Sequence, residues 1–188
     1  MRLRPTVAAV LLLGISSSAA GFAQSSGSFG LRRFDDQVAA YMKIREDANS
    51  RVGAPVISSN AGEIIEREAL LASAIRKARP HAAAGDIFND VVAFEIRTRI
   101  RAVLDRHHVS ERAVLADAGA EAPLGPAPIG VNGAFDWRFG AAMPASFIAV
   151  LPPVPWPLEY RFVSGNLVLL DVEACLIVDV LPDVLTAR

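Results

Sequence analysis

The chain has 188 residues, the length of one ordinary domain or of one domain with short extensions. Its 19 Lys and Arg residues against 20 Asp and Glu residues give a formal net charge of −1. This balance excludes a strongly basic nucleic-acid-binding protein and an acidic disordered chain. The single Cys excludes an intramolecular disulfide framework, and three His residues are too few to favour a metal site of His alone.

The first 23 residues have the three regions of a secretory signal peptide. Arg2 and Arg4 precede the apolar run 7–15, and a small, polar region ends at Ala23. The apolar run is too short to cross a bilayer core, which needs about 20 residues. We therefore predict a signal peptide cleaved after Ala23 and a periplasmic or extracellular protein with no further membrane span. An N-terminal anchor that is never cleaved is the alternative.

Composition divides the rest of the chain into four parts, of which the last three are expected to form one domain over 32–188. In chain order they are a Ser- and Gly-rich flexible linker at 24–31, a helical region at 32–119, a Pro- and Gly-rich connector with a short helix at 120–158, and a β-meander at 159–188.

Apolar residues at helical spacing predict three to four helices in the helical region. Asn60 and Ser110 are expected to cap the second and fourth, and Pro144 to open the short helix of the connector. The expected buried stripes of the first three helices are Phe34, Val38, Tyr41, Met42, Arg45 and Ala48, then Ile64, Leu71, Ile75 and Ala78, and then Val92, Ile96, Ile100 and Val103.

The C-terminal segment predicts three antiparallel strands, at 159–163, 167–171 and 175–181, because links of about three residues join neighbouring strands. Apolar side chains alternate onto both faces, so such a sheet needs cover on both sides. The helices can cover one face, and the proline-rich segment 152–157 or a partner protein can cover the other. The fold class is therefore α+β, with N-terminal helices packed on a three-stranded meander.

Two carboxylates, Asp171 and Glu173, form the candidate acidic site. If both remain extended they share one face of the hairpin, where they could serve as acid and base or hold a hard cation. The alternative is that they are ordinary exposed acids at a turn. Asp179 lies on the same hairpin.

Aromatic residues concentrate in the second half of the chain. Trp137, Trp156 and Tyr160 are candidates for a ligand groove or a partner surface, with core filling as the alternative. His107 and His108 with Asp105 are the only His-centred cluster, and a favourable helix end is the preferred explanation because further metal ligands are not in sight.

Two short motifs and the meander resemble segments of a group of exported bacterial proteins of unknown function. The motifs are Ala-Arg-Pro at 78–80 and Gly-Asp-Ile-Phe at 85–88, and the meander reads LEYRFV, LVLLDV and LIVDVLPD. This resemblance implies export and no particular activity. Within the second motif a structural role is expected: Gly85 can take a positive φ, Asp86 can bond the main chain beyond it, and Ile87 and Phe88 would enter the core.

The sequence thus favours a small exported envelope protein that binds an envelope protein partner without catalysis. A periplasmic small-ligand or metal-binding protein is the first alternative. A metal-dependent hydrolase using Asp171 and Glu173 is the second. No cofactor and no nucleic-acid partner is predicted, and the oligomeric state is left open.

Overall fold

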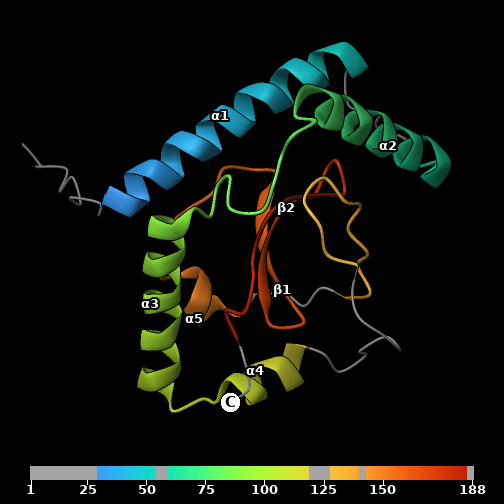
Figure 1. Ribbon diagram of the computed structural model, residues 1–188. Coiled ribbons are helices and arrows are strands. Elements are labelled where there is room, and N and C mark those ends of the chain that lie inside the picture. The colour runs from blue at the N-terminus through green and yellow to red at the C-terminus, as the bar shows by residue number, and fades with distance from the viewer. Residues whose placement is uncertain (1–28, 54–58, 119–127, 140–142, 186–188) are drawn as a thin grey trace, which may run out of the picture.

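The computed structural model describes residues 29–53, 59–118, 128–139 and 143–185 (Figure 1). The chain is α+β, as predicted, with helices packed against a C-terminal antiparallel sheet. In chain order the described elements are α1 (Phe29–Val52), α2 (Ala61–Ala78), α3 (Asp90–His107), α4 (Glu111–Ala118), α5 (Ala145–Ile148), β1 (Leu158–Val163), β2 (Asn166–Asp171) and β3 (Leu176–Leu181). The expected signal peptide and cleavage site lie outside the described residues.

Helix α1 buries the stripe that its spacing predicts, including Phe34, Val38 and Tyr41. It begins earlier than the sequence predicts, since the composition of 29–31 is that of the flexible linker. Gly30 accounts for the difference: a Cβ there would meet the Val91 carbonyl oxygen at 3.3 Å. The composition of this segment alone predicts an irregular linker, but close packing against the start of α3 stabilises it as a helix.

Helices α2 and α4 carry the expected caps. The Asn60 side chain accepts a hydrogen bond from the Gly62 N–H at 3.0 Å, and Ser110 Oγ accepts one from the Ala113 N–H at 3.1 Å. The predicted stripe of α2 is wrong at both ends, because Ile64 is 41% exposed and Ala78 is also exposed. Only the later part of α2, around Leu71 and Ile75, reaches the core.

The sheet is a meander of order β1-β2-β3, as predicted. In Figure 1, α3 and α5 lie on one side of it and the segment 128–139 lies on the other. Side chains of β2 alternate between the two: Leu167 and Leu169 join the helices, whereas Val168 and Leu170 pack with Phe135. The second face is therefore covered by the chain's own connector, and neither the proline-rich segment nor a partner protein is needed there.

The β1–β2 turn depends on Gly165. Its φ is +83°, and a Cβ at this position would meet the Leu185 carbonyl oxygen at 2.4 Å. The Gly165 carbonyl also accepts hydrogen bonds from the N–H groups of Val184 and Leu185.

Gly165→Ala is expected to destabilise the protein by about 2 kcal/mol or more. The new side chain would be strained at this positive φ, and its Cβ would also clash with the Leu185 carbonyl oxygen. Urea unfolding measures the loss. Gly53→Ala is the control: Gly53 has φ +94° but nothing within 4 Å of its Cβ position, so it reports the strain alone. Equal losses in both variants would contradict the packing role of Gly165.

Candidate functional site

A buried polar network joins α1 to the end of β2. Asp171 is fully buried, and its Oδ2 accepts hydrogen bonds from Tyr41 Oη and Arg45 Nε, both at 2.8 Å. Its Oδ1 accepts a third from the Ala174 N–H at 3.1 Å. Burial and the neighbouring Asp171 carboxylate raise the pKa of Tyr41 far above its usual range. The Tyr41 hydroxyl therefore stays protonated and acts as a donor.

The two predicted carboxylates do come together, but around a cation. Arg45 donates from Nε to Asp171 and from a terminal nitrogen to Glu173. Its guanidinium takes the position between the carboxylates that a hard cation would need. Asp171 is also no exposed turn acid, since it is completely buried.

A second buried acid holds the Gly-Asp-Ile-Phe turn. Asp179 Oδ2 accepts hydrogen bonds from the N–H groups of Ile87 and Phe88 at 2.7 Å, and its Oδ1 accepts one from Gly85 at 2.9 Å. Burial raises the pKa of Asp179, and these main-chain donors oppose the shift. Asp179 thus ties β3 to a turn 91 to 94 residues earlier in the chain.

The structural behaviour expected of the motif is confirmed for Gly85, Ile87 and Phe88, but the main-chain bond of Asp86 runs in the opposite direction to the one predicted. Gly85 has φ +92°, and Ile87 and Phe88 are buried in the core. Asp86 Oδ2 accepts a hydrogen bond from the Ala83 N–H at 3.0 Å, so Asp86 binds the main chain on its N-terminal side. Its carboxylate is half exposed.

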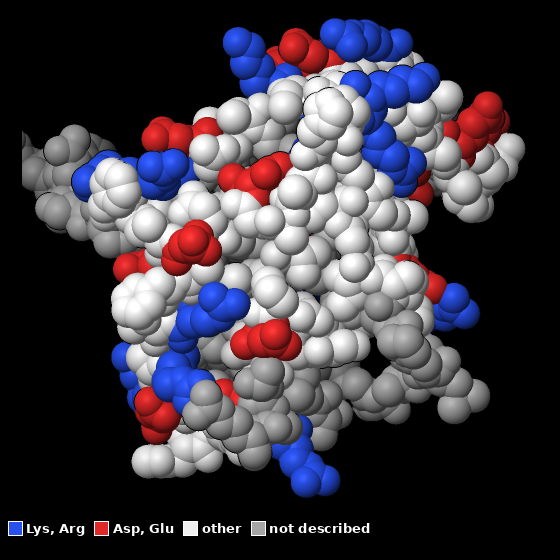
Figure 2. Space-filling view, viewed as in Figure 1, with Lys and Arg blue, Asp and Glu red and all other residues white. Residues whose placement is uncertain are grey.

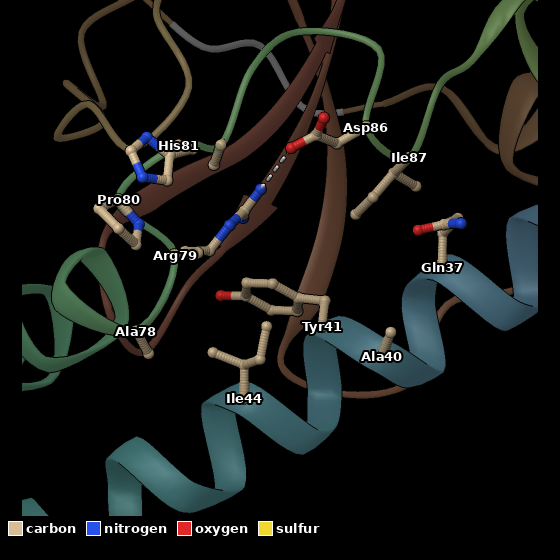
Figure 3. Close-up of a pocket in the computed structure, with 11 residues that line it drawn as sticks. Gln37, Ala40, Tyr41, Ile44, Ala78, Arg79, Pro80, His81, Asp86 and Ile87 are labelled. Carbon is tan, nitrogen blue, oxygen red and sulfur yellow. Dashed lines mark ion pairs between the residues drawn. The ribbon is translucent and has the colours of Figure 1, made fainter.

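A cleft of about 400 Å³ lies between α1 and the segment 79–87. Figure 3 shows its two walls facing each other. Helix α1 contributes Gln37, Ala40, Tyr41 and Ile44; the opposite wall contributes Ala78, Arg79, Pro80, His81, Ala82, Asp86 and Ile87. Both short motifs that carry the resemblance, 78–80 and 85–88, thus reach the cleft.

Arg79 is the central polar side chain of this cleft. It is 9% exposed, donates one hydrogen bond to the Val178 carbonyl at 3.1 Å, and stacks over the Tyr41 ring at 5.3 Å. A terminal nitrogen lies 3.8 Å from Asp86 Oδ2, beyond hydrogen-bond distance. Burial lowers the pKa of Arg79, a sign that its guanidinium has lost solvation.

The three predicted aromatic residues do not form one surface. Tyr160 is buried on the helix side of the sheet, where its hydroxyl donates to the Pro152 carbonyl at 2.9 Å. Trp137 is 48% exposed and lies on the other side, where its ring packs edge-to-face with Phe135 and the Arg161 guanidinium lies over it. Trp156 is 67% exposed.

The sequence analysis missed Tyr41, Arg45 and Arg79 as site residues. A signal for Arg45 was present, because a charged residue inside an otherwise apolar stripe must find a buried partner. The position of Arg79 at the end of α2, close to Arg76 and Lys77, indicates only a cation that interacts favourably with the helix end.

The remaining candidates lie elsewhere. His107 ends α3, and His108 takes a left-handed conformation just after it. Cys175 is a partly buried free thiol whose pKa is raised by burial. Within the described ranges no group of three His, Cys, Asp or Glu side chains could hold a metal ion, and no helix has the length and apolar character to cross a membrane. No protein-family model, no curated protein and no solved structure matches this chain.

Proposed function

We propose that this protein is exported to the cell envelope and that it acts there by binding a small molecule rather than by catalysis. The signal-peptide pattern of residues 1–23 and the resemblance to exported bacterial proteins support the compartment. The position of Arg45 between Asp171 and Glu173 supports binding over hydrolysis, because it neutralises the only predicted acid pair.

One observation carries the choice of the binding site. The guanidinium of Arg79 lies in the cleft with a single hydrogen bond to the rest of the described chain. A guanidinium carries five N–H donors, so most of them remain for a ligand. Buried polar groups normally have hydrogen-bond partners, and a cleft with a few oriented polar groups and apolar walls is the usual form of a small-molecule site.

The protein's surface charge fits a small ligand better than a polyanion. Figure 2 shows acidic and basic side chains interspersed over α1 and α3, with an uncharged area between them on this face. On this face neither the positive nor the negative side chains form a large continuous patch of the kind that would attract nucleic acid.

Thermal unfolding tests the proposal. The processed protein is screened against amino acids, sugars, nucleotides and carboxylates. A ligand of the cleft should raise the midpoint by about 5 °C at about 100 times its Kd. Ala40→Trp fills the cleft and should abolish the shift. Ala39→Trp, one position along the same exposed stretch of α1 and outside the lining, should leave it intact. A flat screen, or a shift that Ala40→Trp retains, contradicts the proposal.

Binding of an envelope protein is the second candidate function. The edge strand β1 borders a cleft of about 340 Å³ that is lined in part by Ile148, which is 57% exposed. Trp156, two residues before β1, is 67% exposed. Exposed apolar side chains beside an edge strand suit an extended apolar segment of a partner. Capture from envelope extract should then fail for Trp156→Ala and succeed for Trp137→Ala. Identical captures by both variants would contradict this role of Trp156.

A further inference from the structure

The cleft between α1 and 79–87 presents one cation and one anion side by side. Figure 3 shows the Arg79 and Asp86 side chains pointing toward one another above the Tyr41 ring. Their closest nitrogen and oxygen atoms are 3.8 Å apart, so the charges face each other without a hydrogen bond. The pair is therefore available to a ligand that offers each member a closer partner.

Arg79 is held in a fixed orientation for this purpose. Its hydrogen bond to the Val178 carbonyl and its stacking on Tyr41 position the guanidinium. Tyr41 is itself fixed by its bond to the buried Asp171. A planar guanidinium with free parallel N–H groups matches a carboxylate, which it can bind through two hydrogen bonds. The lowered pKa of Arg79 shows the lost solvation that such a carboxylate would replace.

Asp86 is held just as firmly, on the same wall of the cleft as Arg79. Its Oδ2 accepts the Ala83 N–H, and among the described residues nothing donates a hydrogen bond to its Oδ1. The turn that carries it is anchored by Asp179 through Gly85, Ile87 and Phe88. Oδ1 can therefore accept hydrogen bonds from an ammonium group, whose three donors need such acceptors.

The charge of the site disfavours ligands of a single sign. A simple anion at Arg79 would lie against Asp86, and the buried Asp179 adds to the repulsion. A simple cation at Asp86 would lie against the Arg79 guanidinium. A ligand with a carboxylate and an ammonium group close together satisfies both.

Apart from the polar side chains of Gln37 and His81, the rest of the lining is suited to an aliphatic group. Ala40 and Ile44 on α1 face Pro80 and Ile87 on the other wall (Figure 3). These side chains offer apolar contact and no further charge.

We propose that the ligand of this cleft is a free α-amino acid with an aliphatic side chain. Its carboxylate binds Arg79, its ammonium group binds Asp86, and its side chain contacts Ile44 and Ile87. This inference rests on the proposed small-molecule function and adds the chemical class of the ligand.

Isothermal titration calorimetry with three leucine derivatives tests both contacts. L-leucine should bind the processed protein. L-leucinamide lacks the carboxylate and N-acetyl-L-leucine lacks the ammonium group, so each should bind about tenfold more weakly or worse. Equal affinity for all three would overturn the inference.

Asp86→Asn separates the two contacts within the protein. The asparagine oxygen can still accept the Ala83 N–H, and the side chain is half exposed, so the fold should tolerate the change. L-leucine should lose about tenfold in affinity, whereas N-acetyl-L-leucine should bind as well as before or better. Loss of both to the same extent would show that Asp86 contributes only to the shape of the turn.

The two tryptophan variants of α1 keep the two proposals distinguishable. Ala40→Trp should abolish L-leucine binding and Ala39→Trp should preserve it. If L-leucine fails to bind while another compound shifts the wild type and Ala39→Trp but not Ala40→Trp, the amino-acid inference is overturned and the binding function stands. If no compound binds, both are overturned.

Discussion

Asp179→Asn is expected to destabilise the protein by about 3 kcal/mol or more. The substitution keeps the shape of the side chain but replaces one oxygen by an NH₂ group. Each carboxylate oxygen accepts two main-chain N–H groups in the native fold. The single oxygen of the amide can accept from only one of these pairs. The other two N–H groups then lose their acceptor and face the NH₂ group of the new side chain. Each unsatisfied buried donor costs about 1–3 kcal/mol.

Urea unfolding of the purified variant measures this loss against a matched control. Asp183→Asn makes the same chemical change four residues along the chain, at an exposed position. Its effect should stay within about 0.5 kcal/mol. If the two variants unfold at the same urea concentration, Asp179 does not hold the Gly-Asp-Ile-Phe turn.

The contrast between what the sequence predicts well and what it misses has a physical origin. The buried stripe of α3, the caps Asn60 and Ser110 and the order of the strands are all set by neighbours a few residues apart. Local periodicity and turn chemistry therefore predict them. The start of α1 is missed because a contact with Val91, far along the chain, extends the helix.

The site depends on contacts of longer range. Arg45 meets Asp171 across 126 residues, and Phe88 meets Asp179 across 91. The sequence shows each acid as a turn or strand residue, and nothing local indicates that one anchors a helix and the other a loop. The cleft lies between those two anchored elements, so its residues could not be brought together from spacing alone.

Arg45→Met is expected to destabilise the protein by about 3–5 kcal/mol. The change keeps much of the apolar stem of the side chain but removes the charge facing Asp171, which has no access to solvent. A buried carboxylate that loses its cation is far more costly than the loss of an exposed ion pair. Arg101→Met provides the contrast, since Arg101 is 64% exposed and its pair with Glu111 should contribute at most about 1 kcal/mol.

A double-mutant cycle then assigns the loss to the pair itself. Asp171→Asn removes the buried charge while its oxygen still accepts from Tyr41, so combining it with Arg45→Met should cost about 1–3 kcal/mol less than the sum of the single changes. Strict additivity would show that Arg45 stabilises α1 by packing alone. The cycle also bears on the cleft, because Asp171 orients Tyr41 and Tyr41 supports the Arg79 guanidinium. Folded protein that lacks the Arg45–Asp171 pair should therefore bind the ligand of the cleft more weakly, although neither residue lines it.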